Sequence, residues 1–248
     1  MLVAPRGVGR PAQPGPATDA GGFSRAQDGV AAAATIGLDS DPGGLRMRPD
    51  IVPGGTFPDY ELPDHTKVAR KLSELQGEDP LILTLARGHY CPKEHQQHLE
   101  LAAFYPKVAV AYTQVATIAT DDDHELKEFR ASVGAQWTFL SDPGRIVQKE
   151  LDIQEYTDPE NDPMIPHTLV LKPGLVIHSI YHGYWFWGRP SVGDLWRDLR
   201  AASSEIRPDW DLDAPGLREA WEGGERALFH GYDEGSTAAG SSPTRGVA

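Results

Sequence analysis

The hydrophobic pattern of the chain contains two short apolar runs that are typical of buried strands. Leu81–Ala86 is the stronger of the two, and Gln114–Thr120 has the same texture. The stretch between them is long enough for a helix, and its apolar positions would line one side: Leu99, Ala102, Ala103 and Tyr105. A strand, a helix and a strand in this order favour parallel pairing of the two strands.

The segments that follow complete an α/β pattern. An amphipathic stretch after the second strand predicts a helix whose buried face carries Leu126, Phe129 and Val133. A short helix is expected near 146–151, and residues 166–183 have the shape of an antiparallel hairpin with a Pro-Gly turn. A closing helix is predicted over 191–202, with Ser191 as its N-cap. The pattern therefore predicts an α/β fold with a mixed central sheet flanked by helices.

The amino-acid composition and the hydrophobic pattern of the chain change near both ends. Residues 1–50 are rich in Gly, Pro and Ala and show no sustained period, which predicts a disordered extension. Residues 51–204 carry enough apolar surface for one domain with its own core. Residues 205–248 turn acidic and then rich in Gly and Ser, and we expect a loose tail. Within that tail, one short docking helix is predicted from Leu217, Trp221 and Leu228.

Composition and charge exclude several classes of function. The chain has 248 residues, and its 23 basic against 36 acidic side chains give a formal net charge of −13. Such a surface repels phosphate backbones and anionic lipid, so we expect neither a nucleic acid nor a membrane as partner. No apolar run reaches the length of a membrane helix, and the N-terminus lacks the apolar segment of a secretory signal. The sequence therefore predicts a cytoplasmic protein.

Cys91 is the single cysteine of the chain, which excludes an internal disulfide and any site built from several cysteines. It lies between the first predicted strand and the helix, and Pro92 suits the first helical position. A helix N-terminus stabilises an anion by about 0.3–1 kcal/mol, whereas lowering a thiol pKa from about 8.5 to about 6 takes about 3.4 kcal/mol. A reactive thiolate here therefore also needs a cation.

Two neighbours could supply that cation, Arg87 and His89. Arg87 is the better candidate because a guanidinium is charged at any relevant pH. The position predicts a reactive thiolate at Cys91, but a lone cysteine is equally well explained as a small buried hydrophobic residue. Position alone leaves the two interpretations open.

Six short segments carry a resemblance to a known family through their order and spacing. They are Phe57–Leu62, Leu72–Leu75, Arg87-Gly88, Cys91–Glu94, Ser141-Asp142 and Ile165-Pro166. Together they resemble the alkyl hydroperoxide reductase and thiol-specific antioxidant family, which are peroxiredoxin-like proteins of the thioredoxin fold with a redoxin domain. The resemblance covers nearly all of the core and implies a thioredoxin-like fold for residues 51–204. It also implies a cis-proline at Pro166, against the active thiol.

The resemblance implies an activity as well. Cys91 would be the peroxidatic cysteine, whose thiolate attacks a hydroperoxide and becomes a sulfenic acid. Glu94 would hold the hydrogen-bond network of the site, and Pro92 and Pro166 would shape the pocket. Without a second cysteine, an external thiol such as a thioredoxin-type protein or a small thiol would reduce the enzyme. This one-Cys scheme needs no cofactor and would give an antioxidant oxidoreductase that serves cell redox homeostasis.

The sequence departs from the family pattern at three positions. Gly88 stands where typical members have a threonine, and Pro166 stands where they have an arginine. Glu94 stands where one subgroup has a second cysteine. Arg87 is the candidate to replace the arginine, and Thr84 or His89 is the candidate to supply a hydroxyl or an imidazole. These departures leave open a second hypothesis, a binding or redox-sensing protein that has lost turnover.

Two further features have alternative interpretations. A Cys/His metal site is one, because five potential ligands fall within ten residues: His89, Cys91, Glu94, His95 and His98. Histidines on a solvated helix surface are the other explanation. The aromatic loop Tyr184–Trp187 predicts either a homodimer contact or a seal on the sheet edge of the same chain.

Overall fold

The computed structural model describes residues 47–183 and 188–225. Most of the predicted N-terminal extension, the aromatic loop Tyr184–Trp187 and Leu228 therefore lie outside the described residues. Within the described ranges, no helix combines the length and the apolar character that crossing a membrane requires.

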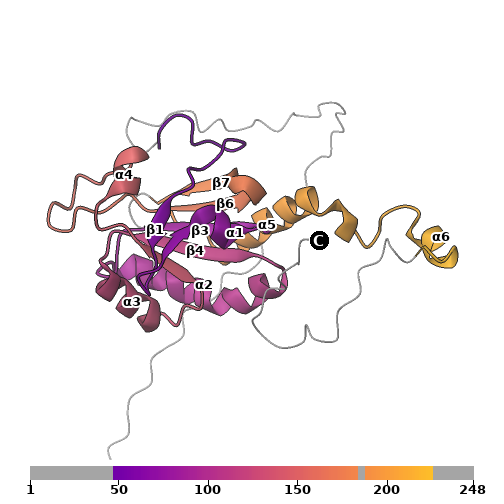
Figure 1. The fold of residues 1–248 in the computed structure, drawn as a ribbon, viewed down its shortest axis with the longest axis horizontal. Helices are drawn as coiled ribbons and strands as arrows, with labels where there is room; N and C mark the ends of the chain where they lie inside the picture. The colour runs from indigo at the N-terminus through magenta and orange to yellow at the C-terminus, as the bar shows by residue number, and fades with distance from the viewer. Residues whose placement is uncertain (1–46, 184–187, 226–248) are drawn as a thin grey trace, which may run out of the picture. The chain divides into compact units, whose positions relative to one another are not determined.

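A five-stranded mixed sheet forms the centre of the fold, in the order β5-β4-β3-β6-β7 (Figure 1). The central strand β3 (Leu81–Ala86) pairs in parallel with β4 (Gln114–Ala119), which pairs in parallel with β5 (Thr138–Ser141). On its other side, β3 pairs antiparallel with β6 (His167–Lys172), and β6 pairs antiparallel with β7 (Val176–His182). Both predicted buried strands and the mixed sheet are confirmed.

The predicted hairpin is also confirmed. A short 3₁₀ turn, η1 (Pro173–Leu175), joins β6 to β7. Gly174 has a φ of +75° in this turn, a backbone conformation that side chains with a Cβ rarely adopt. The Pro-Gly pair therefore sets the reversal of the chain, as its sequence indicates.

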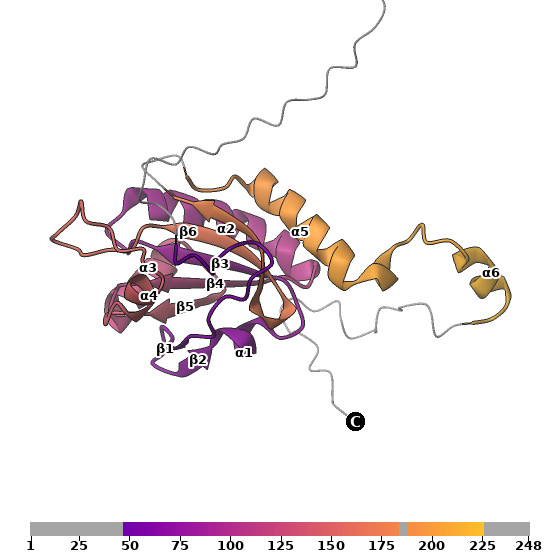
Figure 2. The same ribbon diagram turned by 90° about the horizontal axis from the view of Figure 1, so that it is seen from above.

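Three helices lie over one face of the sheet, two of them along its upper side in Figure 2, and their apolar side chains form one cluster with that face. They are α2 (Pro92–Val110), α3 (Asp123–Ser132) and α5 (Val192–Ile206). Ser191 caps α5 through its hydroxyl, which accepts a hydrogen bond from the backbone N–H of Asp194 at 3.1 Å. This confirms the predicted cap, and the helix continues past its predicted end.

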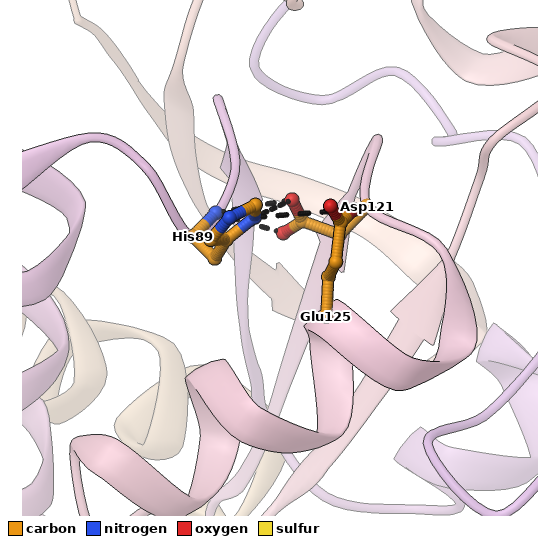
Figure 3. Close-up of side chains that lie close together, drawn as sticks. All are labelled: His89, Asp121 and Glu125. Carbon is orange, nitrogen blue, oxygen red and sulfur yellow. Dashed lines mark hydrogen bonds and ion pairs between the residues drawn. The ribbon is translucent and has the colours of Figure 1, made fainter.

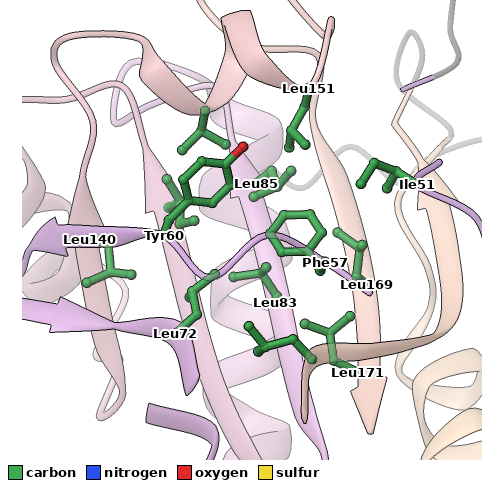
Figure 4. Packing of buried hydrophobic residues seen from close by; sticks show 14 of the residues in the cluster. Ile51, Phe57, Tyr60, Leu72, Leu83, Leu85, Leu140, Leu151, Leu169 and Leu171 are labelled. Atoms are coloured by element: carbon green, nitrogen blue, oxygen red, sulfur yellow. The ribbon is translucent and has the colours of Figure 1, made fainter. Parts of the chain in front are cut away.

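The opposite face of the sheet is covered by the N-terminal part of the described chain. This part includes the hairpin of β1 (Glu61–Pro63) and β2 (Ala69–Lys71), followed by α1 (Leu72–Gln76), and α4 (Ile146–Glu150) packs on the same face. Figure 4 shows the apolar cluster between these layers, which includes Phe57, Tyr60, Leu83, Leu85, Leu151, Leu169 and Leu171. The alternation of β3 residues between this cluster and the helix-side cluster explains why the strand reads as a nearly continuous apolar run.

Beyond α5 the described chain contains η2 (Pro208–Trp210) and α6 (Leu217–Glu222). The helix α6 lies where a short helix was predicted in the tail. The side chain of Trp221 is 55% exposed, and docking of this helix stays a prediction.

The predicted buried face of α2 is confirmed only in part. Ala102 and Tyr105 are partly buried and pack against the helix-side cluster. Leu99 is 53% exposed and Ala103 is also exposed. The fully buried positions of the helix are Glu94, Gln97, His98, Leu101, Phe104 and Val108. Apolar periodicity misplaced part of the face because the first half of the helix buries polar side chains, each of which has a hydrogen-bonding partner on another part of the molecule.

Candidate active site

Cys91 lies at the end of the turn that follows β3 and occupies the N-cap position of α2. Its backbone carbonyl accepts hydrogen bonds from the N–H groups of Glu94 and His95 at 3.1 and 3.2 Å. Pro92 is the first helical residue, where its missing N–H costs no hydrogen bond. The Cys91 side chain is a free thiol and only 3% exposed. The predicted strand, turn and helix around this thiol are therefore confirmed.

Arg87 is the cation that the structure brings to the thiol. Its Nη1 lies 3.7 Å from Cys91 Sγ. The same guanidinium forms a two-pronged ion pair with Glu155, through Nε at 2.8 Å and Nη2 at 2.9 Å. Asp158 accepts a further hydrogen bond from Nη2 at 3.3 Å. Arg87 therefore connects Cys91 with two carboxylates that the sequence analysis did not single out, in an acidic loop between α4 and β6.

Asp121 holds the turn that precedes Cys91 (Figure 3). Its carboxylate accepts hydrogen bonds from the backbone N–H of His89 at 2.9 and 3.1 Å and lies 2.7 Å from His89 Nδ1. Burial raises the pKa of Asp121, while His89 opposes that shift. Burial alone would lower the pKa of His89, but the hydrogen bond and charge of Asp121 outweigh it and raise that pKa. His89 therefore serves the turn, with its imidazole tied to a buried carboxylate.

His89 and Asp121, together with Glu125, have the composition of a small cation site. Ligand atoms of His89, Asp121 and Glu125 lie within 4.8 Å of one another. An imidazole with two carboxylates suits a divalent ion such as Zn²⁺ or Mn²⁺. In this structure Asp121 is already occupied by the hydrogen bonds of the turn, so these contacts are accounted for without an ion.

The alternative Cys/His metal set is not brought together in the described part of the chain. His95 Nε2 lies 2.8 Å from the backbone carbonyl of His89, which can accept its proton. His98 is fully buried, with Nδ1 2.8 Å from the carbonyl of Glu94 and Nε2 3.1 Å from Thr117 Oγ1. These histidines are satisfied within the protein because α2 turns them towards different partners.

Glu94 forms a buried ion pair with Arg189, which lies shortly before α5. The side chain of Glu94 is 1% exposed and that of Arg189 is 10% exposed. Burial raises the pKa of Glu94, and the charge of Arg189 opposes the rise. Glu94 Oε2 and the Nε and Nη1 groups of Arg189 are buried without a hydrogen-bond partner. No local pattern in the sequence indicates Arg189 as this partner, although a buried glutamate in the first turn of α2 requires a counter-charge.

Thr84 is placed in the core rather than exposed to a ligand. Its hydroxyl lies 2.7 Å from Thr117 Oγ1 and donates to the carbonyl of Ala116 at 3.3 Å. Trp137 Nε1 donates to the same Thr117 hydroxyl at 3.0 Å. The Thr84 hydroxyl is therefore used inside the helix-side core, and its assignment as a pocket residue stays a prediction without support from these contacts.

Pro166 differs from the expectation in its backbone. No peptide bond among the described residues is cis, so the predicted cis-proline is wrong. The carbonyl of Pro166 accepts a hydrogen bond from the N–H of Gly183 at 2.7 Å. This hydrogen bond joins the residue before β6 to the residue after β7 and so closes the open end of the β6–β7 hairpin. Gly183 permits this approach, because a Cβ there would lie 2.5 Å from the Pro166 carbonyl oxygen.

Comparison with known proteins adds a family and a fold. The sequence matches the family model described as "AhpC/TSA family" over residues 53–180. No protein with a curated description matches the chain. Among solved structures, the chain is similar to the peroxidoxin BcpB of Mycobacterium tuberculosis, with 18% identity and a TM-score of 0.51, covering 63% of this chain and 96% of that one.

Two further structures show the same likeness. PrxQ of Xylella fastidiosa is 17% identical with a TM-score of 0.52, covering 62% of this chain and 96% of that one. AhpC of Enterococcus faecalis is 15% identical with a TM-score of 0.52, covering 64% of this chain and 96% of that one. These peroxiredoxins have the thioredoxin fold, and the predicted fold class is confirmed.

Proposed function

This chain belongs to the AhpC/TSA family of peroxiredoxin-like proteins, and from that membership we propose that it reduces hydroperoxides through Cys91 by a one-Cys mechanism. The observation that supports the proposal best is the 3.7 Å contact between Arg87 Nη1 and Cys91 Sγ at the N-terminus of α2. A guanidinium and a helix N-terminus both stabilise an anion, and the thiolate is the nucleophilic form of cysteine.

The proposed reaction has two stages. In the first, the thiolate of Cys91 attacks one peroxide oxygen, the O–O bond breaks, and the other oxygen leaves as an alcohol or water after taking up a proton. The sulfur is then a sulfenic acid. In the second, one external thiol attacks the sulfenic acid and forms a mixed disulfide with Cys91, with release of water. A second external thiol then attacks this disulfide, so that Cys91 is released as a thiol and the two external thiols are joined in a disulfide. An external reductant is required because the chain has a single cysteine.

Arg189 is the counter-charge of Glu94, the other site residue proposed on α2. Its guanidinium pairs with Glu94, which lies one helical turn from Cys91 on α2. This buried ion pair supports the assignment of Glu94 to the hydrogen-bond network of the site.

Oxidation of Cys91 by hydrogen peroxide tests this function. The reduced protein is mixed with excess peroxide, sulfenic acid is trapped and located by mass spectrometry, and peroxide loss is followed after addition of a small thiol or a thioredoxin-type protein. We expect oxidation much faster than that of a free thiol and donor-dependent peroxide loss. Arg87→Gln should slow oxidation about ten-fold, which corresponds to about 1.4 kcal/mol.

Cys91→Ser is the control for this experiment and should abolish both the trapped sulfenic acid and the peroxide loss. Oxidation no faster than that of a free thiol would contradict the peroxidase function. Circular dichroism of each variant shows whether the fold is retained.

A redox-sensing or binding protein without turnover is the second candidate. It is favoured by the burial of Cys91, which is 3% exposed, and by the two carboxylates that share the charge of Arg87. This candidate predicts stoichiometric oxidation of Cys91 without donor-dependent turnover.

The homodimer contact through Tyr184–Trp187 and the cytoplasmic location stay predictions.

A further inference from the structure

The guanidinium of Arg87 binds carboxylates through two of its nitrogens and faces the thiol with the third. Nε and Nη2 are held by Glu155, and Nη2 is also bonded to Asp158. Nη1 is the nitrogen that faces Cys91 Sγ. The nitrogen that contacts the sulfur is therefore the one that neither carboxylate binds.

We propose that Glu155 is a positioning residue that orients Arg87 so that Nη1 contacts the Cys91 thiolate. The inference rests on the proposed function in that it treats the thiolate as the reacting group. A guanidinium and a carboxylate fit each other as two planar forks, so a two-pronged pair fixes both the plane and the rotation of the arginine. Without Glu155, Arg87 would keep one hydrogen bond to Asp158 at 3.3 Å and the contact of its Cζ with the Tyr90 ring at 5.5 Å. These two contacts constrain the rotation of the guanidinium less than a two-pronged pair does.

The loop that carries Glu155 is built to hold a fixed position. Its two ends are joined by a hydrogen bond from the N–H of Ile165 to the carbonyl of Ile153 at 2.7 Å. The N–H of Glu155 itself donates to the carbonyl of Pro163 at 3.0 Å. The carboxylate of Glu155 accepts a further hydrogen bond from the hydroxyl of Thr157 at 2.6 Å. Backbone and side chain of Glu155 are thus both anchored before they meet Arg87.

The ion pair is also sheltered from solvent. The side chains of Arg87 and Glu155 are 22% and 19% exposed, and that of Asp158 is 20% exposed. Charges with this degree of burial are screened less than surface pairs, so the pair holds its geometry better than an exposed one. Asp158 is oriented in turn by the side-chain amide of Asn161, which donates to both carboxylate oxygens at 3.0 Å.

Glu155 has two effects on the thiolate that oppose each other. Its charge offsets that of Arg87, whereas its geometry directs Nη1 to the sulfur. If orientation dominates, removing the carboxylate makes Cys91 less reactive; if charge dominates, removal makes it more reactive. The sign of the change therefore decides the inference.

Alkylation of Cys91 by iodoacetamide measures this sign without using peroxide. Because the full chain has one cysteine, the rate reports this thiol alone. We expect Glu155→Ala to slow alkylation at pH 7 about ten-fold. Glu155→Gln should have a smaller effect, because its amide oxygen still accepts one hydrogen bond from Arg87.

Two controls separate positioning from general damage to the loop. Glu160→Gln removes an acid at an exposed position of the same loop and should leave the alkylation profile unchanged. In an Arg87→Gln background, Glu155→Ala should no longer slow alkylation, because the arginine through which it acts is absent.

Faster or unchanged alkylation in Glu155→Ala would overturn the inference, and so would equal slowing in the Arg87→Gln background. A wild-type protein that is alkylated quickly but does not react with peroxide would overturn the proposed peroxidase function instead. The two failures are therefore distinguishable.

Discussion

Gly88 occupies the position, three residues before Cys91, where typical family members have a threonine. Its φ of +132° lies in a region that residues with a Cβ rarely adopt. A Cβ at this position would also lie 2.8 Å from Asp121 Oδ1 and 3.2 Å from Tyr90 Cε1. The carboxylate of Asp121, which accepts hydrogen bonds from the turn before Cys91, thus fills the space that the threonine would need. The departure from the family pattern has a steric and conformational cause.

We expect Gly88→Ala to lower the free energy of unfolding by about 2–3 kcal/mol, because strain and a clash add. Gly134→Ala is a matched control, since Gly134 has a φ of +66° but no atom within 4 Å of a Cβ. This control should cost only about 1 kcal/mol. Urea unfolding of both variants measures the difference, and equal costs would show that Asp121 moves aside easily.

At the scale of elements, α2 is the helix that connects the core to the site. Its buried face begins with polar residues and ends with apolar ones. Gln97 donates to the hydroxyl of Thr168 on β6 at 2.8 Å, and Glu94 pairs with Arg189. The orientation of α2, and with it the position of Cys91 at its N-terminus, therefore depends on polar partners as well as on apolar packing.

Removing Arg189 tests this dependence. Arg189→Met leaves Glu94 buried without its counter-charge, and we expect the free energy of unfolding at pH 7 to fall by about 3–5 kcal/mol. Burial already raises the pKa of Glu94, and loss of the arginine raises it further. Because the neutral acid is tolerated in the core, the difference from wild type should shrink as the pH falls from 7 to 5.

Lys67→Met is the control for this prediction, because its pair with Asp123 at 2.7 Å is exposed. It should cost much less than Arg189→Met, because exposed ion pairs contribute little to stability. Urea unfolding at the two pH values compares each variant with the wild type. A cost of Arg189→Met no larger than that of Lys67→Met would show that the buried pair contributes little.

At the scale of the whole molecule, two buried histidines make stability depend on pH. Burial lowers the pKa of His98 to about 4 and that of His167 to about 3. The unfolded chain protonates each imidazole near pH 6.5. Below that pH the unfolded state binds more protons than the folded state, so the contribution to stability is present above about pH 6.5 and is lost as the pH falls towards the folded values.

His98→Gln isolates one of these contributions. Between its folded and unfolded pKa values, each histidine changes the free energy of unfolding by up to about 1.4 kcal/mol per pH unit. We expect His98→Gln to flatten the fall in unfolding free energy between pH 6 and 4.5 by about 1 kcal/mol per unit, as measured by urea unfolding. His124→Gln, at a side chain that is 77% exposed, is the control for loss of a histidine from the surface. An unchanged slope in His98→Gln would mean that His98 titrates alike in both states.

The central elements of the fold were predictable because their signals are local. Leu81–Ala86 alternates between two apolar clusters and therefore carries an apolar run in the sequence itself. The cap of α5 was predictable from Ser191 because capping acts within three residues. The polar part of the buried face of α2 was not predictable, because the burial of Glu94, Gln97 and His98 depends on partners from other elements.

The same division applies to the site. The sequence by itself determined that Cys91 begins a helix after a buried strand, with Arg87 four residues away, because one turn of chain brings them together. The tertiary structure alone decided what surrounds them. Glu155 and Asp158 reach Arg87 across 68 and 71 residues, and Arg189 reaches Glu94 across 95. No local pattern marks such contacts, because they form only when the sheet and the loops around it have folded.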